Sequence, residues 1–188
     1  MSIPRRYTSA DLERLPDVEG TRYEIIDGEL HVSRQPHWEH QYACHRAAYA
    51  LEAWHEQSGA GVVIPAPGLI FAEDQDVAPD VVWISRERLA QAKDEAGHLR
   101  AAPELVVEVL SPGAANERRD REVKLALYSR QGVEEYWIVD WRARTVQVYR
   151  RAEETLRPVA TLGSGDVLTS PLLPGITCPV SSLWASPG

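Results

Sequence analysis

The stretch PELVVEVLSP, residues 103–112, constrains the fold of this chain more than any other part of it. Its Leu and Val residues are apolar on both faces of an extended strand, a pattern typical of a strand inside a mixed or parallel sheet. Glu108 lies in the middle of this strand. An unpaired buried charge costs several kcal/mol or becomes neutral, so a buried Glu normally has a partner. The stretch therefore predicts an interior strand with a metal ion, a Lys or Arg, or a hydrogen-bond network beside Glu108.

The rest of the chain alternates between helical and extended patterns. Asp27-Gly28 between two short extended runs is typical of a tight hairpin, and Gly132 is a typical residue after a helix end. The predicted helices cover residues 8–15, 36–57, a short stretch from Ser85, and 111–132. The predicted strands are the hairpin pair within 21–34, then 61–67, 68–74, 78–85, 103–112, 134–140, 144–150 and a short strand around Val159. This order predicts an α/β fold with a mixed sheet flanked by at least two helices.

Length and composition favour one cytoplasmic domain. With 188 residues the chain is long enough for one core and short for two, so we expect a single domain spanning 1–188. No apolar run reaches the ~20 residues that cross a bilayer, and residues 1–15 lack the apolar segment of a signal peptide. We therefore expect a cytoplasmic protein without a membrane partner, in which Cys44 and Cys178 are free thiols.

The charge distribution leaves nucleic-acid binding open. The formal net charge of −8 argues against a general coat for nucleic acids, because such a coat needs a basic surface. Residues 1–110 carry 10 Lys and Arg against 19 Asp and Glu, whereas residues 111–157 carry 10 against 8. The second segment is therefore compatible with a locally basic face. Lysine occurs only at Lys93 and Lys124, which makes these two positions informative.

Three residues form a pattern that can carry chemistry: Asp80 opens one strand, Glu108 lies within a later strand, and Lys124 lies on the next helix. Two carboxylates on adjacent strands can hold a hard divalent cation, and the carbonyl of Val109 could complete the protein's ligands. Such an ion polarises a phosphoryl oxygen and lowers the pKa of bound water, while a nearby ammonium orients that water or stabilises charge. Hydrolysis of a phosphodiester needs these functions.

Each of the three residues also has an ordinary structural interpretation. Asp80 is a common type of turn former, and Lys124 is a common type of solvated helix residue. Glu108 needs only a basic partner, such as Arg118 or Arg121 on the following helix. The spacing alone therefore does not separate a metal site from a set of unrelated charges.

Four motifs in order give the chain a specific resemblance. They are YEIIDGE at 23–29, PDVVWIS at 79–85, ELVVEVLSP at 104–112, and the run from Lys124 to Asp140 with K-x-x-x-Y followed by GVEEYWIVD. Together these motifs resemble the Uma family, whose members are assigned as endonucleases within the restriction-endonuclease-like PD-(D/E)XK superfamily. The resemblance covers residues 20–150.

The resemblance implies a restriction-endonuclease-like fold, with a core of a mixed four-stranded sheet flanked by helices and an N-terminal hairpin extension. It also implies cleavage of DNA that depends on Mg²⁺, with Mn²⁺ as an alternative ion. By position, Asp80 matches the first acid of the superfamily motif and Glu108 the second. The motif lysine would fall at Leu110, which cannot serve, and Lys124 on the following helix takes that role.

Two further residues are weaker candidates for the site. Glu24 matches an acidic position of the family and would act through water or a second metal, or else it simply flanks the hairpin. His40 lies on the apolar stripe of its helix, where it either reaches a phosphate or the surroundings of the metal, or is a core residue. The acidic residues within 73–76 are interpreted as a solvated turn.

The sequence therefore supports a Mg²⁺-dependent DNA endonuclease in which Asp80, Glu108 and Val109 hold the metal and Lys124, Glu24 and His40 act with it. The alternative is a DNA- or protein-binding scaffold that keeps the nuclease fold without catalysis. A phosphodiesterase for nucleotides or RNA would use the same residues. Superfamily enzymes that cut both strands often pair two sites, so a homodimer is compatible with this interpretation, although nothing in the chain fixes it.

Overall fold

The computed structural model of the protein describes residues 5–185, in which one long helix accompanies short helices and strands. In chain order the elements are α1 (Ser9–Leu12), β1 (Thr21–Ile26), β2 (Glu29–Arg34), α2 (Trp38–Ser58), β3 (Gly61–Pro65), β4 (Leu69–Ala72), β5 (Gln75–Val77), β6 (Val81–Ser85), α3 (Arg86–Ala92), β7 (Leu105–Val109), α4 (Ala114–Arg118), the π-helix η1 (Arg119–Lys124), α5 (Leu125–Gln131), β8 (Glu135–Asp140), β9 (Thr145–Ala152), β10 (Thr155–Gly163), β11 (Val167–Leu168), β12 (Cys178–Pro179) and the 3₁₀-helix η2 (Val180–Leu183).

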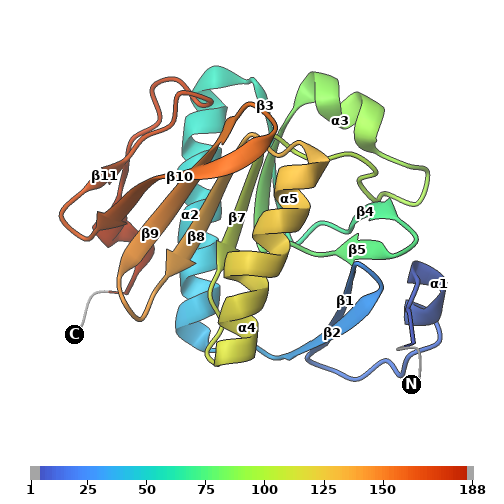
Figure 1. Cartoon of the computed structure of the whole chain (residues 1–188). Helices are drawn as coiled ribbons and strands as arrows, with labels where there is room; N and C mark the ends of the chain where they lie inside the picture. The colour runs from blue at the N-terminus through green and yellow to red at the C-terminus, as the bar shows by residue number, and fades with distance from the viewer. Residues whose placement is uncertain (1–4, 186–188) are drawn as a thin grey trace.

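The largest sheet is mixed, as predicted. Its strand order is β10-β9-β8-β7-β6-β3, and the pair β7–β8 is parallel while the other pairs are antiparallel. Figure 1 shows α2 on one face of this sheet and the helix formed by α4, η1 and α5 on the other. The sheet has six strands rather than the four implied by the resemblance, because β3 and β10 extend its two edges. β10 is also longer than the short strand predicted around Val159.

The side chains of β7 alternate between two cores. Leu105, Val107 and Val109 pack in the cluster that contains the α2 residues, whereas Val106 packs in the cluster that contains the α5 residues. Successive strand residues point to opposite faces, so Glu108 belongs to the same face as Val106. The strand therefore presents Glu108 to the helix formed by α4, η1 and α5.

A second sheet, with the order β2-β1-β5-β4, contains the predicted hairpin. Asp27 and Gly28 at its tip both have positive φ, 52° and 74°, as a two-residue hairpin turn requires. Strand β5 was not predicted, because the acidic run 73–76 was interpreted as a solvated turn. That interpretation is wrong for Asp76, which lies within β5 opposite Ile25 of β1 and has a pKa raised by burial.

The two longest predicted helices are confirmed with small shifts and one irregularity. Helix α2 covers Trp38–Ser58 and ends at Gly59, whose φ is 63°. The predicted helix at 111–132 begins at Ala114 and ends before Gly132. Its middle turn, η1, is a π-helix, which sequence periodicity did not predict. Within the described residues, no helix is long and apolar enough to cross a membrane.

Candidate active site

The six residues predicted for the site surround one cavity. It has a volume of about 320 Å³, and Glu24, His40, Asp80, Glu108, Val109 and Lys124 all line it. They come from β1, α2, the bend before β6, strand β7 and the end of η1. The cavity thus lies where the two larger sheets meet α2 and the helix formed by α4, η1 and α5.

Asp80 and Glu108 reach the same cavity from neighbouring strands. The β6–β7 register pairs Val81 with Val107, and one more step in the same register brings Asp80 opposite Glu108. The backbone N–H of Val109 donates to Asp80 Oδ2 at 2.8 Å, and Arg22 Nη1 lies 3.5 Å from Asp80 Oδ1. The antiparallel pairing therefore brings the two acids together although 28 positions separate them in the chain.

The buried Glu108 has two partners, and both come from the following helix. Lys124 Nζ donates to Glu108 Oε1 at 2.8 Å, and the Tyr128 hydroxyl donates to the same oxygen at 2.7 Å. Neither arginine considered as a partner from the sequence takes this place. Arg118 pairs with Glu122, and Arg121 pairs with Asp140 and Glu117.

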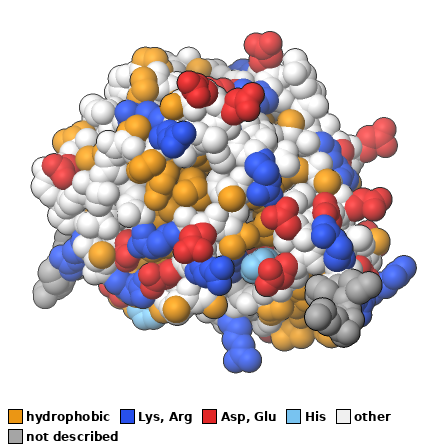
Figure 2. All heavy atoms as spheres, in the orientation of Figure 1, with side chains coloured by type: hydrophobic (Ala, Val, Ile, Leu, Met, Phe, Trp, Pro, Cys, Tyr) orange, Lys and Arg blue, Asp and Glu red, His pale blue; other side chains and the backbone are white. Residues whose placement is uncertain are grey.

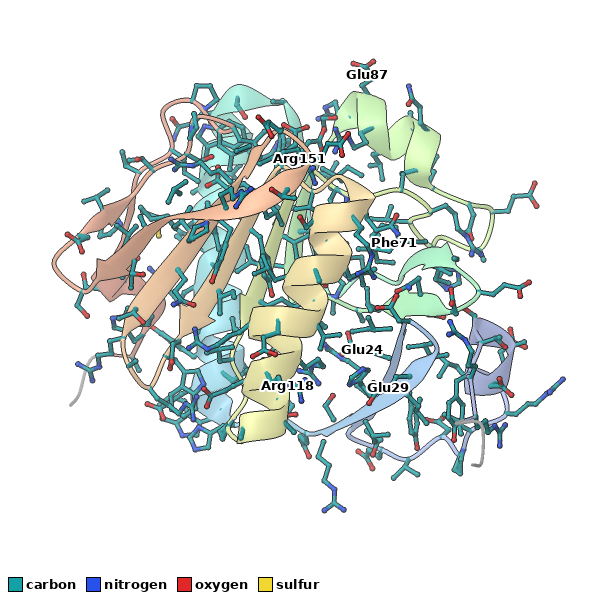
Figure 3. The ribbon with its side chains drawn as sticks, in the orientation of Figure 1. Glu24, Glu29, Phe71, Glu87, Arg118 and Arg151 are labelled. Atoms are coloured by element: carbon teal, nitrogen blue, oxygen red, sulfur yellow. The ribbon has the colours of Figure 1, made fainter. Side chains whose placement is uncertain are left out.

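Lys124 also forms an ion pair with a residue of the second sheet, Glu24 of β1. Its Nζ lies 2.8 Å from Glu24 Oε1, which also accepts a hydrogen bond from the backbone N–H of Ala78 at 3.0 Å. Lys124 and Glu24 are 1% and 2% exposed, so this ion pair is nearly free of solvent. Figure 3 shows Glu24 between the β1–β2 hairpin and the helix formed by α4, η1 and α5. One ammonium therefore joins carboxylates from both sheets.

Arg119 and Asp120 are members of the site that sequence reasoning missed. Arg119 lines the cavity, its Nε donates to Asp120 Oδ1 at 2.9 Å, and its Nη1 lies 3.8 Å from Glu24 Oε2. Asp120 is fully buried, and its carbonyl accepts a hydrogen bond from the Tyr136 hydroxyl at 2.9 Å. In the charged run from 117 to 124 these side chains look solvated. The π-helix turns both of them inward together with Lys124.

The site holds more negative than positive charge. Glu24, Asp80, Glu108 and Asp120 face the buried cations of Lys124 and Arg119, with the half-exposed Arg22 at the edge. Burial raises the pKa of Glu108 to about 8, against the opposing effect of Lys124, and the charges of Asp80, Asp120 and Glu24 raise it further.

The other groups of the site respond differently to the same surroundings. Burial raises the pKa of Glu24, but the charges of Lys124 and Arg119 and the hydrogen bonds that it accepts outweigh this effect and lower it overall. The nearby carboxylates outweigh desolvation at Lys124 and raise the pKa of its ammonium. The surroundings thus favour the charged forms of Lys124 and Glu24, whereas burial raises the pKa of both Glu108 and Asp120 and favours their protonated forms.

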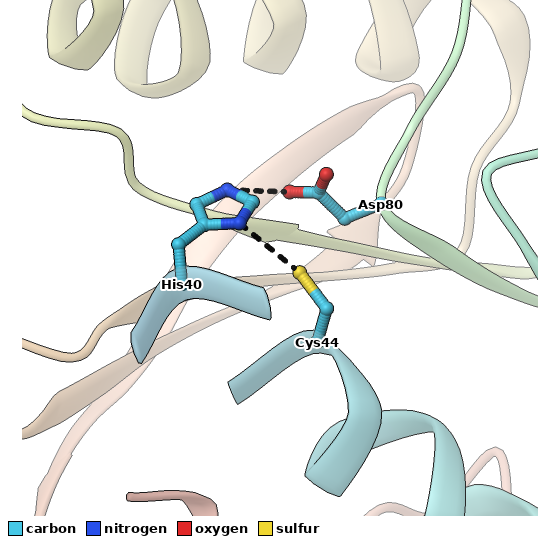
Figure 4. A group of neighbouring side chains, drawn as sticks. All are labelled: His40, Cys44 and Asp80. Atoms are coloured by element: carbon cyan, nitrogen blue, oxygen red, sulfur yellow. Dashed lines mark hydrogen bonds and ion pairs between the residues drawn. The ribbon is translucent and has the colours of Figure 1, made fainter. Parts of the chain in front are cut away.

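His40 reaches the site from α2. Its Nε2 lies 3.5 Å from Asp80 Oδ2, and its Nδ1 lies 3.5 Å from the sulfur of Cys44, one helical turn further along (Figure 4). Burial raises the pKa of the Cys44 thiol, and the charges of Asp80 and Glu108 raise it further, so this thiol is protonated. His40 is 5% exposed, and its side chain lines the cavity. It is therefore a buried residue of the cavity wall and not only a residue of the apolar core.

The donor atoms around the cavity fit a hard divalent cation. Asp80 and Glu108 offer carboxylate oxygens, which Mg²⁺ and Mn²⁺ prefer, and Val109 lines the same cavity. Glu108 Oε2 accepts no hydrogen bond from any residue in the described range, so it is free to bind an ion. The surplus of negative charge is also of the sign that a divalent cation compensates.

The surface facing the viewer of Figure 2 carries mixed charge. Lys and Arg side chains alternate there with Asp and Glu side chains, and no continuous basic stripe crosses this face. The Lys and Arg residues that line the cavity are four separate side chains, Arg22, Arg34, Arg119 and Lys124. This face therefore does not resemble a general nucleic-acid coat.

Comparison with solved structures shows the same fold in another protein. A crystal structure described as "a putative nuclease belonging to DUF820 from Anabaena variabilis ATCC 29413" is similar with a TM-score of 0.72 and 17% sequence identity. The similarity covers 94% of this chain and 96% of that chain. The type IIG restriction endonuclease BpuSI gives a TM-score of 0.40 at 14% identity, over 77% of this chain and 14% of that chain, which is too low to support an argument.

At the level of sequence, no protein of curated function matches the chain. The Uma2 family, described as "Putative restriction endonuclease", matches residues 9–181. This range includes every residue around the cavity named above. Because the match covers nearly all of the sequence, the chain belongs to the Uma2 family of restriction-endonuclease-like proteins.

Proposed function

We propose that the protein is a Mg²⁺-dependent endonuclease that hydrolyses phosphodiester bonds of DNA. The observation that carries this proposal is the pair of carboxylates, Asp80 and Glu108, that line one cavity, with the ammonium of Lys124 bonded to Glu108. The family and its description support the reaction class.

Each residue has a defined role in this proposal. Asp80, Glu108 and the carbonyl of Val109 hold the cation, which when bound polarises a phosphoryl oxygen and acidifies water. Lys124 stabilises negative charge as it develops on the phosphate, and Glu24 keeps Lys124 in place through their ion pair. His40 orients Asp80 from the side of α2. Mn²⁺ satisfies the same oxygen ligands.

The non-catalytic scaffold also has one observation in its favour. Glu108 Oε1 accepts hydrogen bonds from both Lys124 and Tyr128, so this oxygen is satisfied without any metal. A structural ion pair of this kind would hold the helix on the sheet and would need no catalytic role. Metal-dependent cleavage decides between the two functions.

The test is incubation of the purified protein with supercoiled plasmid, linear single-stranded DNA or single-stranded RNA, in the presence of Mg²⁺, Mn²⁺ or EDTA. Glu108→Gln removes a charge that the cation needs, and Lys124→Met removes the ammonium. Loss of either group is expected to slow cleavage at least about 100-fold.

Two variants serve as matched controls. Glu135→Gln changes a Glu of β8 that is also 2% exposed and hydrogen-bonded, but it does not border the cavity. Lys93→Met removes the exposed second lysine. Both controls are expected to cleave like the wild type. Cleavage by Glu108→Gln at the wild-type rate would remove the central role of the carboxylate pair, and a folded wild type that cleaves no substrate would favour the scaffold.

The remaining parts of the proposal concern the setting of the reaction. We take DNA as the substrate, a homodimer as the form that would cut both strands, and the cytoplasm as the location. Light scattering with and without duplex DNA measures the number of chains in each complex, because a pair of sites predicts two chains on one duplex.

A further inference from the structure

Three side chains beside the proposed Mg²⁺ site form a different kind of donor set. His40 offers an imidazole nitrogen, Cys44 a sulfur and Asp80 a carboxylate oxygen, and these atoms all lie within 4.8 Å of one another. Figure 4 shows the three side chains directed toward one another, His40 and Cys44 from α2 and Asp80 from the bend before β6. Within the described residues they are the one group of three or more His, Cys, Asp or Glu donors with this spacing.

The local structure explains why these side chains converge. His40 and Cys44 are four residues apart on α2, so they lie on the same face of the helix one turn apart. The backbone N–H of Ala66 donates to the Asp80 carbonyl at 3.0 Å, and the N–H of Val109 donates to its carboxylate. These bonds hold Asp80 against α2 without using His40 or Cys44.

Asp80 also borders two cavities. The first is the proposed active site, which His40 lines as well. The second has a volume of about 230 Å³, and Cys44, His45 and Asp80 are among the residues that line it. The donor set therefore lies between two cavities, and an ion can enter from the side of Cys44 without crossing the active site.

We propose that His40, Cys44 and Asp80 bind a transition-metal ion of the Zn²⁺ class, and that this ion withdraws Asp80 from the Mg²⁺ site. A sulfur and an imidazole select such an ion over Mg²⁺, which prefers oxygen ligands. Three protein ligands leave the fourth tetrahedral position to water.

In this structure the ring of His40 lies between the other two donors (Figure 4). His40 Nδ1 lies 3.5 Å from the Cys44 sulfur, and His40 Nε2 lies 3.5 Å from Asp80 Oδ2. Neighbouring ligands of a tetrahedral zinc ion are about 3.4 Å apart, given bonds of about 2.0–2.3 Å. Because these two contacts use different nitrogens, the His40 ring must rotate until one nitrogen faces both Cys44 and Asp80. One donor atom of each residue already lies within 4.8 Å of the other two, so the three donors need to move closer by about 1 Å to hold an ion. On binding, the Cys44 thiol releases its proton to solvent and becomes a thiolate.

The consequence for activity rests on the proposed function. A zinc-class ion bound to Asp80 withdraws negative charge from this carboxylate, so Asp80 binds Mg²⁺ less tightly while that ion is present. Zn²⁺ at a concentration that fills this site is therefore expected to inhibit Mg²⁺-dependent cleavage in the wild type. It would not inhibit cleavage in a variant that lacks the sulfur.

The binding test uses Co²⁺ as a spectroscopic probe of the metal-free protein. We expect a thiolate-to-cobalt absorption band in the near ultraviolet, which Zn²⁺ removes by displacement. Cys44→Ser keeps the side-chain volume and abolishes the band, and Asp80→Asn weakens Co²⁺ binding more than about 10-fold. Cys178→Ala is the matched control, because it removes the other free cysteine and leaves the donor set intact.

The outcomes separate this proposal from the proposed nuclease. A band in the wild type and in Cys178→Ala, but not in Cys44→Ser, supports the site even if the protein cleaves no nucleic acid. A wild type without the band, or a band that persists in Cys44→Ser, overturns it. Circular dichroism and melting of each variant establish that a lost band does not come from unfolding. Equal zinc inhibition of cleavage in wild type and Cys44→Ser would refute the sharing of Asp80.

Discussion

Lys124 is the residue on which the charges of the site depend. It is 1% exposed, and its ammonium lies 2.8 Å from both Glu24 and Glu108. A buried charge of this kind is stable only while its partners remain, because desolvation outweighs any single attraction. Tyr128 adds a neutral donor to the same oxygen of Glu108. The residues of the site thus stabilise the fold as well as preparing the chemistry proposed for them.

Replacement of the ammonium by an apolar chain of similar length is expected to be costly. Lys124→Met leaves two buried carboxylates without their shared partner, and we expect a loss of roughly 3–5 kcal/mol in the free energy of unfolding. Urea denaturation measures this loss. Lys93→Met, at an exposed position, is expected to change stability by less than about 0.5 kcal/mol. Equal effects of the two substitutions would contradict a buried ion pair at Lys124.

The hydroxyl of Tyr128 is expected to have a smaller effect. Tyr128→Phe removes one hydrogen bond to Glu108 Oε1 and keeps the ring that packs against Tyr136. We expect a loss of about 1–3 kcal/mol, measured by urea denaturation. Tyr149→Phe is the control, since the hydroxyl of Tyr149 bonds to no residue in the described part of the chain. A Tyr128→Phe protein as stable as this control would mean that the hydrogen bond contributes little.

At the scale of elements, the geometry of η1 determines which of its charged side chains are buried at the site. A π-turn holds one residue more than an α-turn, so it rotates the residues on its two sides relative to each other. Here it lets Arg119, Asp120 and Lys124 all be buried, while Arg118 stays outside with Glu122. Such turns are frequent at functional sites.

Deletion of Glu122, an exposed residue within η1, tests this view. The deletion is expected to restore α-helical geometry, to keep Lys124 and Tyr128 at Glu108, and to rotate Arg119 and Asp120 by about 100° out of their buried positions. We expect cleavage to fall while the helix content in circular dichroism is kept. Glu122→Ala, which keeps the number of residues, should behave like the wild type. Full activity of the deletion variant would show that η1 has no role in the site.

Sequence periodicity predicted most elements. It failed at η1, where one extra residue in the turn breaks the period, and at β5, where the acidic run 73–76 was interpreted as a solvated turn. The β7 strand, the hairpin and α2 have clear patterns, and Asp80, Glu108 and Lys124 could be placed from them. Arg119 and Asp120 could not, because an inserted residue in the helix changes which face they occupy. Cys44 showed no metal-binding spacing, because its third partner, Asp80, comes from another element. The roles of all these residues, and the extent of the domain, stay predictions.

At the scale of the molecule, the surplus of negative charge at the site makes the free energy of unfolding depend on pH and on metal binding. The pKa of Glu108 rises from 4.5 to about 8 on folding, so the folded protein holds an extra proton between these values. Its contribution to stability is complete below about pH 4.5 and is lost as the pH rises toward 8. A divalent cation supplies the missing positive charge at high pH.

Melting curves test this linkage. Without metal, we expect the melting temperature of the wild type to fall relative to that of Glu108→Gln between about pH 5 and pH 9, because only the wild type loses the proton. Mg²⁺ is expected to reverse this fall in the wild type and to release protons on binding at neutral pH. A constant difference between the two proteins across this range would show that Glu108 does not titrate there.

Because Lys124 bonds to acids from both sheets, the site is completed only when distant parts of the chain have come together. Its residues extend from Glu24 to Lys124, and the lysine is the last of them to be synthesised. A nascent or clipped chain that ends before this helix carries the carboxylates but not the ammonium. The proposed endonuclease would thus lack its complete site until this helix has been synthesised and packed against the sheets.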